Sequence, residues 1–259
     1  MSTKSCLLLG CNYLSNLCEM VLFYRKVIIF AILLSIPLTV SSQEDDKQNL
    51  GVWLTYKNRF KINSSFYYID DISYRHTIVY DKWQRFSFNP AIAFNALNEI
   101  EFYFGANNLF VVQDVINNTY ELRIWQGVRM TWPYIKRFHF DHYFRFEERF
   151  IYDFGDKSWN PGYRGRYRLS LTVPINSMVI AESTFYTGIS AEAYTNIGKS
   201  MPEKYLDQAR FSATFGYRKN RKWSFELMYL VDDSKEVKED NFELNNHIIR
   251  FRIINIISL

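Results

Sequence analysis

The chain has 259 residues, a formal net charge of +4 and 18% aromatic residues. This length allows one large all-β domain or two ordinary domains, and the nearly balanced charge carries no nucleic-acid signature. All three cysteines (Cys6, Cys11 and Cys18) lie within the first 18 residues, so disulfides and thiolate metal sites are excluded from the rest of the chain.

The N-terminal region is typical of a targeting segment with an extension before it. The basic pair Arg25 and Lys26 precedes an apolar run over residues 27–38. That run is too short for a membrane-spanning helix, which needs about 20 residues. Small residues at 39–42 favour cleavage before Gln43. We therefore expect an extension over 1–19 before a start at Met20, a cleaved signal peptide over 20–42, and a mature domain over 43–259.

From Asn49 onward, strand-like segments are separated by alternating short and long connections. Successive side chains of a β-strand point to opposite faces, so alternation of apolar and polar residues indicates strands with two different faces. The eleven expected segments are 49–57, 61–73, 83–95, 99–113, 119–132, 137–153, 163–173, 178–190, 208–217, 223–231 and 242–257.

The segment 137–153, RFHFDHYFRFEERFIYD, shows this alternation most clearly. Its even-numbered residues are mostly phenylalanine, and its odd-numbered residues are mostly charged. A soluble strand would bury the aromatic face, but most segments repeat the pattern and the chain has too few elements to cover them all. A transmembrane barrel places apolar side chains toward lipid and polar side chains toward its lumen. The pattern therefore predicts an all-β protein that folds as an antiparallel transmembrane β-barrel.

The number of segments conflicts with a known rule. Bacterial single-chain barrels have an even number of strands, with both ends on the periplasmic side. If the short turns lie on the periplasmic side, the last of the eleven segments also ends on that side. The first segment then begins on the extracellular side. We therefore predict about twelve strands over residues 43–259, with ten as the alternative.

Five segments carry a family resemblance: ELRIWQGV (121–128), YFRFEERF (143–150), YRGRYRLSL (163–171), ARFSATFGYR (209–218) and WSFELMYL (223–230). Together they resemble an uncharacterised family of barrels known as domain of unknown function 2490. The pattern Arg145–x–Glu147–x–Arg149 is the most specific part, and the resemblance runs over 49–257. It implies the outer membrane of a Gram-negative bacterium and brings no established activity. The chain departs from many such barrels by ending in Ser-Leu in place of an aromatic residue.

The predicted inward face is rich in arginine. Thirteen arginines and seven carboxylates alternate onto it, and no lysine does. Arginine pairs carboxylates through a planar fork and stays charged when partly dehydrated. An excess of six positive charges between low-dielectric walls would attract anions. The residues expected to line the lumen are Glu121, Arg123, Arg129, Asp141, Arg145, Glu147, Arg149, Arg164, Arg166, Arg168, Glu182, Arg210 and Glu226.

Three functions are compatible with this interior. The first is a narrow, porin-like channel for small anionic solutes bearing carboxylate or phosphate groups. The second is a non-conducting barrel plugged by its own charge pairs, which serves as a scaffold or assembly partner. A lipid-modifying enzyme is the least favoured, because His142 on the lipid-facing side lacks a compact serine signature. The expected partners are outer-membrane lipid and small anions, with no nucleic acid, no metal and no cofactor, and the sequence specifies no protein partner.

The charges on either side of Ile135 also predict how two segments pair. One register places Arg123 opposite Glu147 and Glu121 opposite Arg149, whereas a shift of two residues opposes like charges. Each favourable cross-strand pair contributes roughly 0.2–1 kcal/mol. We therefore predict the first register, with Ile135 at the centre of the turn.

Overall fold

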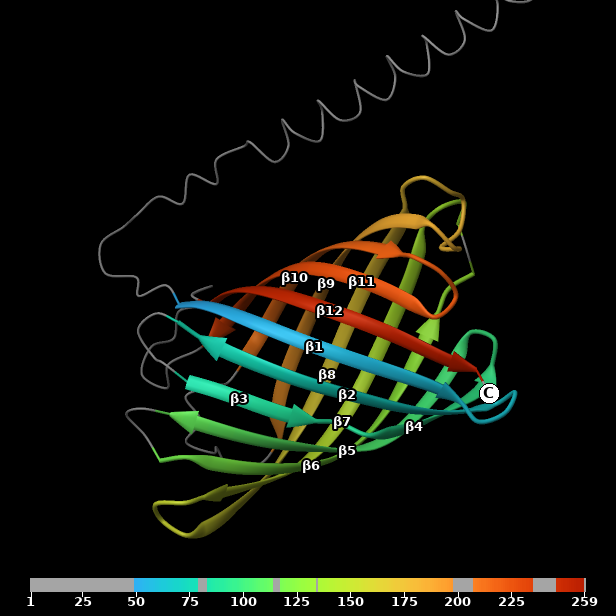
Figure 1. The fold of residues 1–259 in the computed structure, drawn as a ribbon. Coiled ribbons are helices and arrows are strands. Elements are labelled where there is room, and N and C mark those ends of the chain that lie inside the picture. Colours follow the sequence, from blue (N-terminus) through green and yellow to red (C-terminus); the bar gives the residue numbers. More distant parts are fainter. Residues whose placement is uncertain are drawn as a thin grey trace, which may run out of the picture. The chain divides into compact units, whose positions relative to one another are not determined.

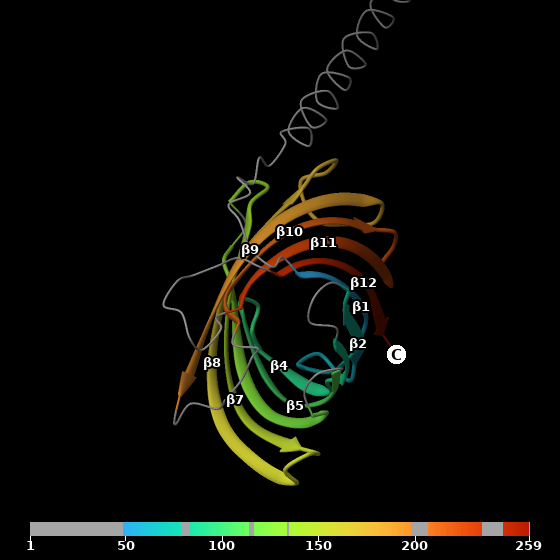
Figure 2. The same cartoon turned by 90° about the vertical axis from the view of Figure 1, so that its left-hand side faces the viewer.

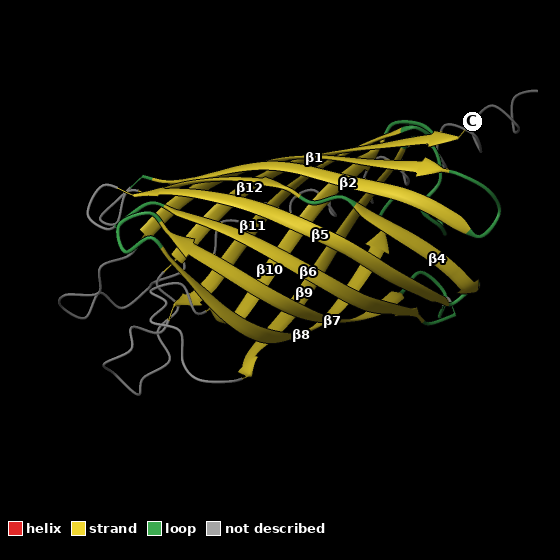
Figure 3. Ribbon diagram, turned by 90° about the horizontal axis from the view of Figure 1, so that it is seen from below, coloured by secondary structure: helices red, strands yellow, loops and turns green. Residues whose placement is uncertain are grey.

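A computed structural model describes residues 49–78, 83–113, 117–133, 135–197, 207–234 and 246–258. The predicted extension (1–19) and signal peptide (20–42) lie outside these residues. Among the described residues, no helix has the length and apolar character needed to cross a membrane. The regular elements are strands, as Figure 3 shows.

Twelve strands close into a single barrel, with the strand order drawn in Figure 1. Neighbours pair antiparallel except at the closure, where β1 pairs in parallel with β12. Viewed from the side chosen in Figure 2, the strands form a ring. The strands are β1 (Asn49–Lys61), β2 (Phe66–Thr77), β3 (Trp83–Phe88), β4 (Ala91–Leu97), β5 (Ile100–Gln113), β6 (Thr119–Thr131), β7 (His139–Asp153), β8 (Ser158–Pro174), β9 (Thr184–Ile197), β10 (Asp207–Arg218), β11 (Trp223–Ser234) and β12 (Asn246–Ser258).

Strands β3 and β4 share one position in the barrel. Both pair with β2 on one side and with β5 on the other. Asn89 and Pro90 separate the two strands along the chain. Proline has no N–H to donate to a ladder, so the strand is interrupted there. The Asn89 side chain accepts a hydrogen bond from the Trp125 indole at 2.9 Å. The all-β barrel of about twelve strands is confirmed, with twelve strands in eleven positions.

The two ends of the barrel differ. The described connections 62–65, 98–99, 175–183 and 219–222 meet at one end, which we call the turn end, where β12 also finishes. At the opposite end, which we call the loop end, β2, β5, β7, β9 and β11 finish. Because β1 runs parallel to β12, β1 starts at the loop end. β1 therefore begins at the end opposite to the one where β12 finishes, as the eleven predicted segments implied. The parallel pairing of β1 with β12 lets the barrel close with this odd number of positions.

Apolar side chains cover the outside of the barrel and polar side chains fill its interior, the reverse of a soluble protein. On β7, Phe144 and Phe150 are exposed on the outer face, whereas Arg145, Glu147 and Arg149 are buried. Large exposed apolar side chains occur along most other strands in the same way. A soluble monomer rarely exposes such an extensive apolar surface.

One apolar cluster lies inside the barrel wall near the β3–β4 break. We call it the aromatic cluster, and its members are Ile69, Ala91, Ala93, Tyr103, Trp125 and Tyr143. The rings of Tyr103 and Tyr143 meet edge to face at 5.8 Å. Gly105 makes room for it, because a Cβ there would lie 2.6 Å from the Trp125 ring.

The predicted register of β6 and β7 is wrong by two residues. Arg123 lies opposite Arg149, and Trp125 lies opposite Glu147. The turn sets this register, because Ile135 and Phe138 bridge each other around Lys136, whose φ is 58°. The turn is therefore centred after Ile135 rather than on it.

Candidate functional site in the barrel interior

A cavity of about 350 Å³ lies inside the barrel. Its lining reaches the loop end at Gln113, Thr119 and Asn160. Thirteen cations and four carboxylates are among the lining residues. The cations are Lys57, Arg75, Arg85, Arg123, Arg129, Arg145, Arg149, Arg164, Arg166, Arg168, Arg210, Arg250 and Arg252, and the carboxylates are Asp71, Glu121, Glu147 and Asp153.

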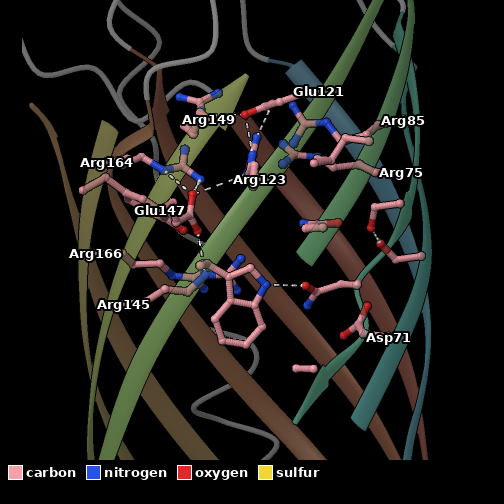
Figure 4. A pocket seen from close by; sticks show the side chains of 18 of the residues that line it. Asp71, Arg75, Arg85, Glu121, Arg123, Arg145, Glu147, Arg149, Arg164 and Arg166 are labelled. Atoms are coloured by element: carbon pink, nitrogen blue, oxygen red, sulfur yellow. Dashed lines mark hydrogen bonds and ion pairs between the residues drawn. The ribbon is translucent and has the colours of Figure 1, made fainter. Parts of the chain in front are cut away.

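Glu147 of β7 is the centre of the largest charge cluster. It is 0% exposed, and its carboxylate contacts Arg164 at 2.6 Å, Arg145 at 2.8 Å and Arg123 at 3.8 Å. These three arginines come from β8, β7 and β6, and Figure 4 shows them converging on the carboxylate. Only the Arg164 contacts have hydrogen-bond geometry, through both Nε and a terminal nitrogen. A single buried carboxylate therefore holds three strands together.

Glu121 of β6 extends this cluster toward the loop end. It accepts hydrogen bonds from Arg123 and from Arg149, each at 2.5 Å. The sequence predicted that Arg123 pairs with Glu147 and Arg149 with Glu121, and both contacts exist despite the shifted register. The contacts are diagonal, because long side chains span the 7–8 Å to a diagonal neighbour.

A second cluster, centred on β9 and β11, was missed by the sequence analysis. Asp232 of β11 is fully buried and binds Arg210 at 2.5 Å and Arg75 at 3.2 Å. Glu192 of β9 pairs with Arg166 and lies 3.4 Å from Arg210. Both carboxylates had been assigned to loops, but β9 and β11 continue further than their alternation indicated.

Fewer charges lie toward the turn end. Glu101 pairs with Arg59, lies 3.4 Å from Arg129 and accepts a hydrogen bond from Tyr103. Glu226 pairs with Arg252 and accepts a hydrogen bond from the Tyr186 hydroxyl at 2.7 Å. The aromatic cluster contributes Ile69, Ala91, Tyr103, Trp125 and Tyr143 to the same part of the cavity lining.

Several interior arginines also stack on aromatic rings. The Arg145 guanidinium lies 3.8 Å from the Trp125 ring centre, and that of Arg250 lies 3.8 Å from the Trp53 ring centre. A planar, weakly hydrated guanidinium stacks in this way better than an ammonium group does. This explains why twelve of the thirteen lining cations are arginine.

Most of the predicted lining residues reach the cavity. Ten of them line it: Glu121, Arg123, Arg129, Arg145, Glu147, Arg149, Arg164, Arg166, Arg168 and Arg210. Glu226 is buried beside the lining residue Arg252. Asp141 is half-buried on the inward face of β7 and is not one of the residues that line the cavity. It accepts a hydrogen bond from Thr131 at 2.7 Å.

The prediction that Glu182 lines the lumen is wrong. Residues 175–183 form a connection rather than the start of a strand, and β9 begins at Thr184. The Glu182 side chain is 54% exposed and pairs at 2.9 Å with Arg221, which is 90% exposed. The expected absence of inward lysine is also wrong, because Lys57 lines the cavity.

The balance of charge inside remains positive. Besides the four lining carboxylates, Glu101, Glu192, Glu226 and Asp232 each bind at least one lining arginine. Thirteen cations against these eight carboxylates leave an excess of five positive charges. The sequence had predicted an excess of six over a different set of inward residues, and the imbalance has the same sign.

His142, the histidine considered for catalysis, lies among aromatic side chains. The Nδ1 of His142 lies 2.8 Å from the Tyr167 hydroxyl, and its ring is 6.0 Å from the Tyr167 ring and from the Trp132 ring. Within the described parts of the chain, no three histidine, cysteine or acidic side chains come together as metal ligands would.

Comparison with known proteins gives one family. The family described as "Protein of unknown function (DUF2490)" matches residues 50–243, which span β1 to β11 and beyond. The comparison with curated proteins found no match.

Proposed function

The chain belongs to the DUF2490 family of unknown function, and from this premise we propose that it is an outer-membrane β-barrel of a Gram-negative bacterium. The inside-out distribution of side chains carries this proposal. Exposed phenylalanine and aliphatic side chains cover the outer face, while buried arginine and glutamate fill the interior. Lipid is the environment that such an outer face matches, because it satisfies apolar side chains and the closed barrel leaves no unpaired strand edge.

Inside this barrel, we propose a narrow path that selects small anions bearing carboxylate or phosphate groups. The support is the excess of positive charge around a cavity of about 350 Å³ that reaches the loop end. Low-dielectric walls focus the field of such charges and raise the local concentration of anions. Glu147 and Asp232 neutralise only part of the positive charge around them, since each is shared by two or more arginines.

A non-conducting barrel is the second candidate, and a specific observation favours it. The aromatic cluster fills part of the interior toward the turn end, where Tyr103 also bonds to Glu101. Such a plug would leave the cavity open to the loop end alone. The protein would then act as an anion receptor or a scaffold rather than as a channel.

Conductance across a planar lipid bilayer separates these candidates. A salt gradient across the bilayer gives the reversal potential, and we expect a sign that indicates preference for anions. Arg168→Ser should reduce that preference, because Arg168 lines the cavity and has no carboxylate within 4 Å among the described residues. Arg221→Ser removes an equal charge from an exposed turn and serves as the control. Cation selectivity of the unmodified protein would contradict the proposed path, and absence of conductance would favour the plug.

A further inference from the structure

Asp70 of β2 places a carboxylate on the outer face of the barrel. Ile69 and Asp71, the residues on either side of it, both line the cavity, so the alternation of the strand turns Asp70 outward. Ile72, the next outward residue, is 52% exposed. Charged side chains on a lipid-facing surface destabilise a barrel, at a cost that falls toward the membrane–water interface. A carboxylate there is stabilised by an interfacial position and by a cationic partner.

Asp70 belongs to a row of polar side chains that crosses three neighbouring strands, β2, β1 and β12 (Figure 1). Asn58 of β1 lies directly opposite Asp70, and its amide donates to the Asp70 Oδ1 at 2.8 Å. Asn255 of β12 lies directly opposite Asn58, and its amide donates to the Tyr56 hydroxyl at 3.3 Å. Directly opposite residues share a face of the sheet, so these side chains point outward together. We call Asp70, Asn58, Asn255 and Tyr56 the outer polar patch. Glu148 of β7 also faces outward, but no described side chain hydrogen-bonds to it.

No described cation of the protein pairs with Asp70. Among the described residues, no lysine, arginine or histidine nitrogen lies within 4 Å of its carboxylate. Asn58 bonds to Oδ1 alone, and Oδ2 accepts no hydrogen bond within the described ranges. Charged groups that are removed from water in proteins are paired with an opposite charge or bind an ion. Asp70 is only 8% exposed, so a cation from outside the chain is the partner that would satisfy its free oxygen.

The outer polar patch lies near the turn end, between aromatic rings. β1 and β12 each continue for three residues beyond the two asparagines before they finish at that end. The centre of the Tyr56 ring lies 6.5 Å from that of Trp223, and the centre of the Phe60 ring lies 5.9 Å from that of Tyr68. Tyrosine and tryptophan collect at the level of the lipid headgroups, where one end of the side chain is apolar and the other is wet. These rings therefore indicate that the patch meets the headgroups of the leaflet at the turn end.

The polar groups of the patch complement a zwitterionic headgroup. The free Asp70 oxygen accepts from an N–H donor, and the negative charge strengthens a hydrogen bond from a cation. The Asn58 and Asn255 amides each have a second N–H, and the Tyr56 hydroxyl, which accepts from Asn255, still has its own O–H to donate. A charged acceptor and several donors thus lie side by side, as the ammonium and the phosphate do in phosphatidylethanolamine.

We propose that the outer polar patch binds the headgroup of a phospholipid that carries a primary ammonium group. The ammonium donates to Asp70, and the phosphate oxygens accept from Asn58, Asn255 and Tyr56. A second copy of the chain fits the patch less well, because a symmetric contact through it would bring two Asp70 carboxylates together. The inference rests on the proposed outer-membrane barrel and identifies the lipid that its outer face selects.

Native mass spectrometry of the folded full-length protein tests this site by counting bound lipids. The protein is held in micelles of an uncharged detergent and mixed with equal amounts of phosphatidylethanolamine, phosphatidylcholine and phosphatidylglycerol that have the same acyl chains. All three share the phosphate, whereas only phosphatidylethanolamine has N–H donors on a cationic headgroup. We expect its adducts to exceed those of phosphatidylglycerol by about tenfold, the factor that one charge-assisted hydrogen bond supplies, with phosphatidylcholine between them.

Substitutions separate the two ends of the headgroup. Asp70→Asn keeps an acceptor for Asn58 but removes the charge, so it should abolish the preference for phosphatidylethanolamine. Asp70→Glu keeps the charge and should keep the preference. Tyr56→Phe removes only a hydroxyl that faces the shared phosphate, so it should weaken the adducts of all three lipids alike. Glu182→Gln removes an equal charge from an exposed turn at the same end and should leave the adducts unchanged.

Equal adducts of phosphatidylethanolamine and phosphatidylglycerol on the unmodified protein would overturn the proposal, as would an unchanged preference in Asp70→Asn. A dimer that Asp70→Asn abolishes, without any lipid preference, would assign the patch to a second copy and overturn it too. Each of these results contradicts only this site, because retention of lipid whatever its headgroup still fits an outer face in contact with lipid. Absence of adducts of all three lipids would contradict that contact, and with it both the membrane barrel and the site.

Discussion

Removal of the Glu147 charge should destabilise the barrel far more than removal of an exposed charge. Glu147 is 0% exposed and contacts Arg164, Arg145 and Arg123. In Glu147→Gln, Arg123 keeps Glu121 at 2.5 Å as a partner. Arg145 and Arg164 lose the carboxylate that contacts them. Loss of one partner from a buried ion pair costs about 3–5 kcal/mol. Gln retains an acceptor oxygen for Arg164, so we expect a loss of about 3 kcal/mol, at the lower end of that range.

The assay is urea unfolding of the refolded protein in detergent micelles, followed by tryptophan fluorescence. A lower midpoint with an unchanged dependence on urea reports a change in stability alone. Glu182→Gln is the matched control, because Glu182 belongs to the exposed pair with Arg221. Exposed pairs contribute about 0–1 kcal/mol, so this variant should unfold almost as the unmodified protein does.

A double variant sharpens the test. If Glu147 and Arg164 stabilise each other, Glu147→Gln combined with Arg164→Gln should cost less than the sum of the two single changes. The reasoning would be refuted if Glu147→Gln and Glu182→Gln had equal effects on the midpoint. It would also be refuted if the double variant showed simple additivity.

Two further predictions concern the barrel wall. Gly105→Ala should destabilise the fold by about 1–3 kcal/mol, because the new methyl group would lie 2.6 Å from the Trp125 ring, whereas Gly165→Ala meets its nearest atom at 3.8 Å and should be tolerated. Urea midpoints check this, and equal effects of the two substitutions would contradict it. Phe144→Arg on the outer face should cost about 2–4 kcal/mol in lipid vesicles, and Phe138→Arg beside the turn at most about 1 kcal/mol. An unchanged stability of Phe144→Arg in vesicles would mean that this face does not contact lipid.

The alternation of the sequence was enough to predict which side chains face inward, because facing depends on the strand period alone. The odd-numbered residues from Arg145 to Arg149 are buried as predicted, and the phenylalanines between and beside them lie on the outer face. The excess of positive charge inside follows directly from those facings. The family resemblance added the expectation of an outer-membrane barrel and covered nearly the same residues that the family match does.

The parts that could not be predicted depend on contacts between strands. The register of β6 and β7 follows the turn around Lys136 rather than the charges, because arginine reaches diagonal partners about as well as opposite ones. The inward positions of Glu192 and Asp232 depend on pairing that extends β9 and β11 into apparent loops. Lys57 lies on β1, whose alternation was visible, so its place in the cavity lining could have been predicted.

Cysteine labelling in intact cells tests most directly whether the barrel spans the outer membrane. After residue 43 the chain has no cysteine, so Asp156→Cys in the exposed loop-end connection and Ser64→Cys in the exposed turn-end connection each introduce one new thiol there. With a maleimide that cannot cross membranes, Asp156→Cys should be labelled in intact cells and Ser64→Cys only after the outer membrane is permeabilised. Labelling of both positions in intact cells, or of Ser64→Cys alone, would contradict the proposed barrel and its orientation.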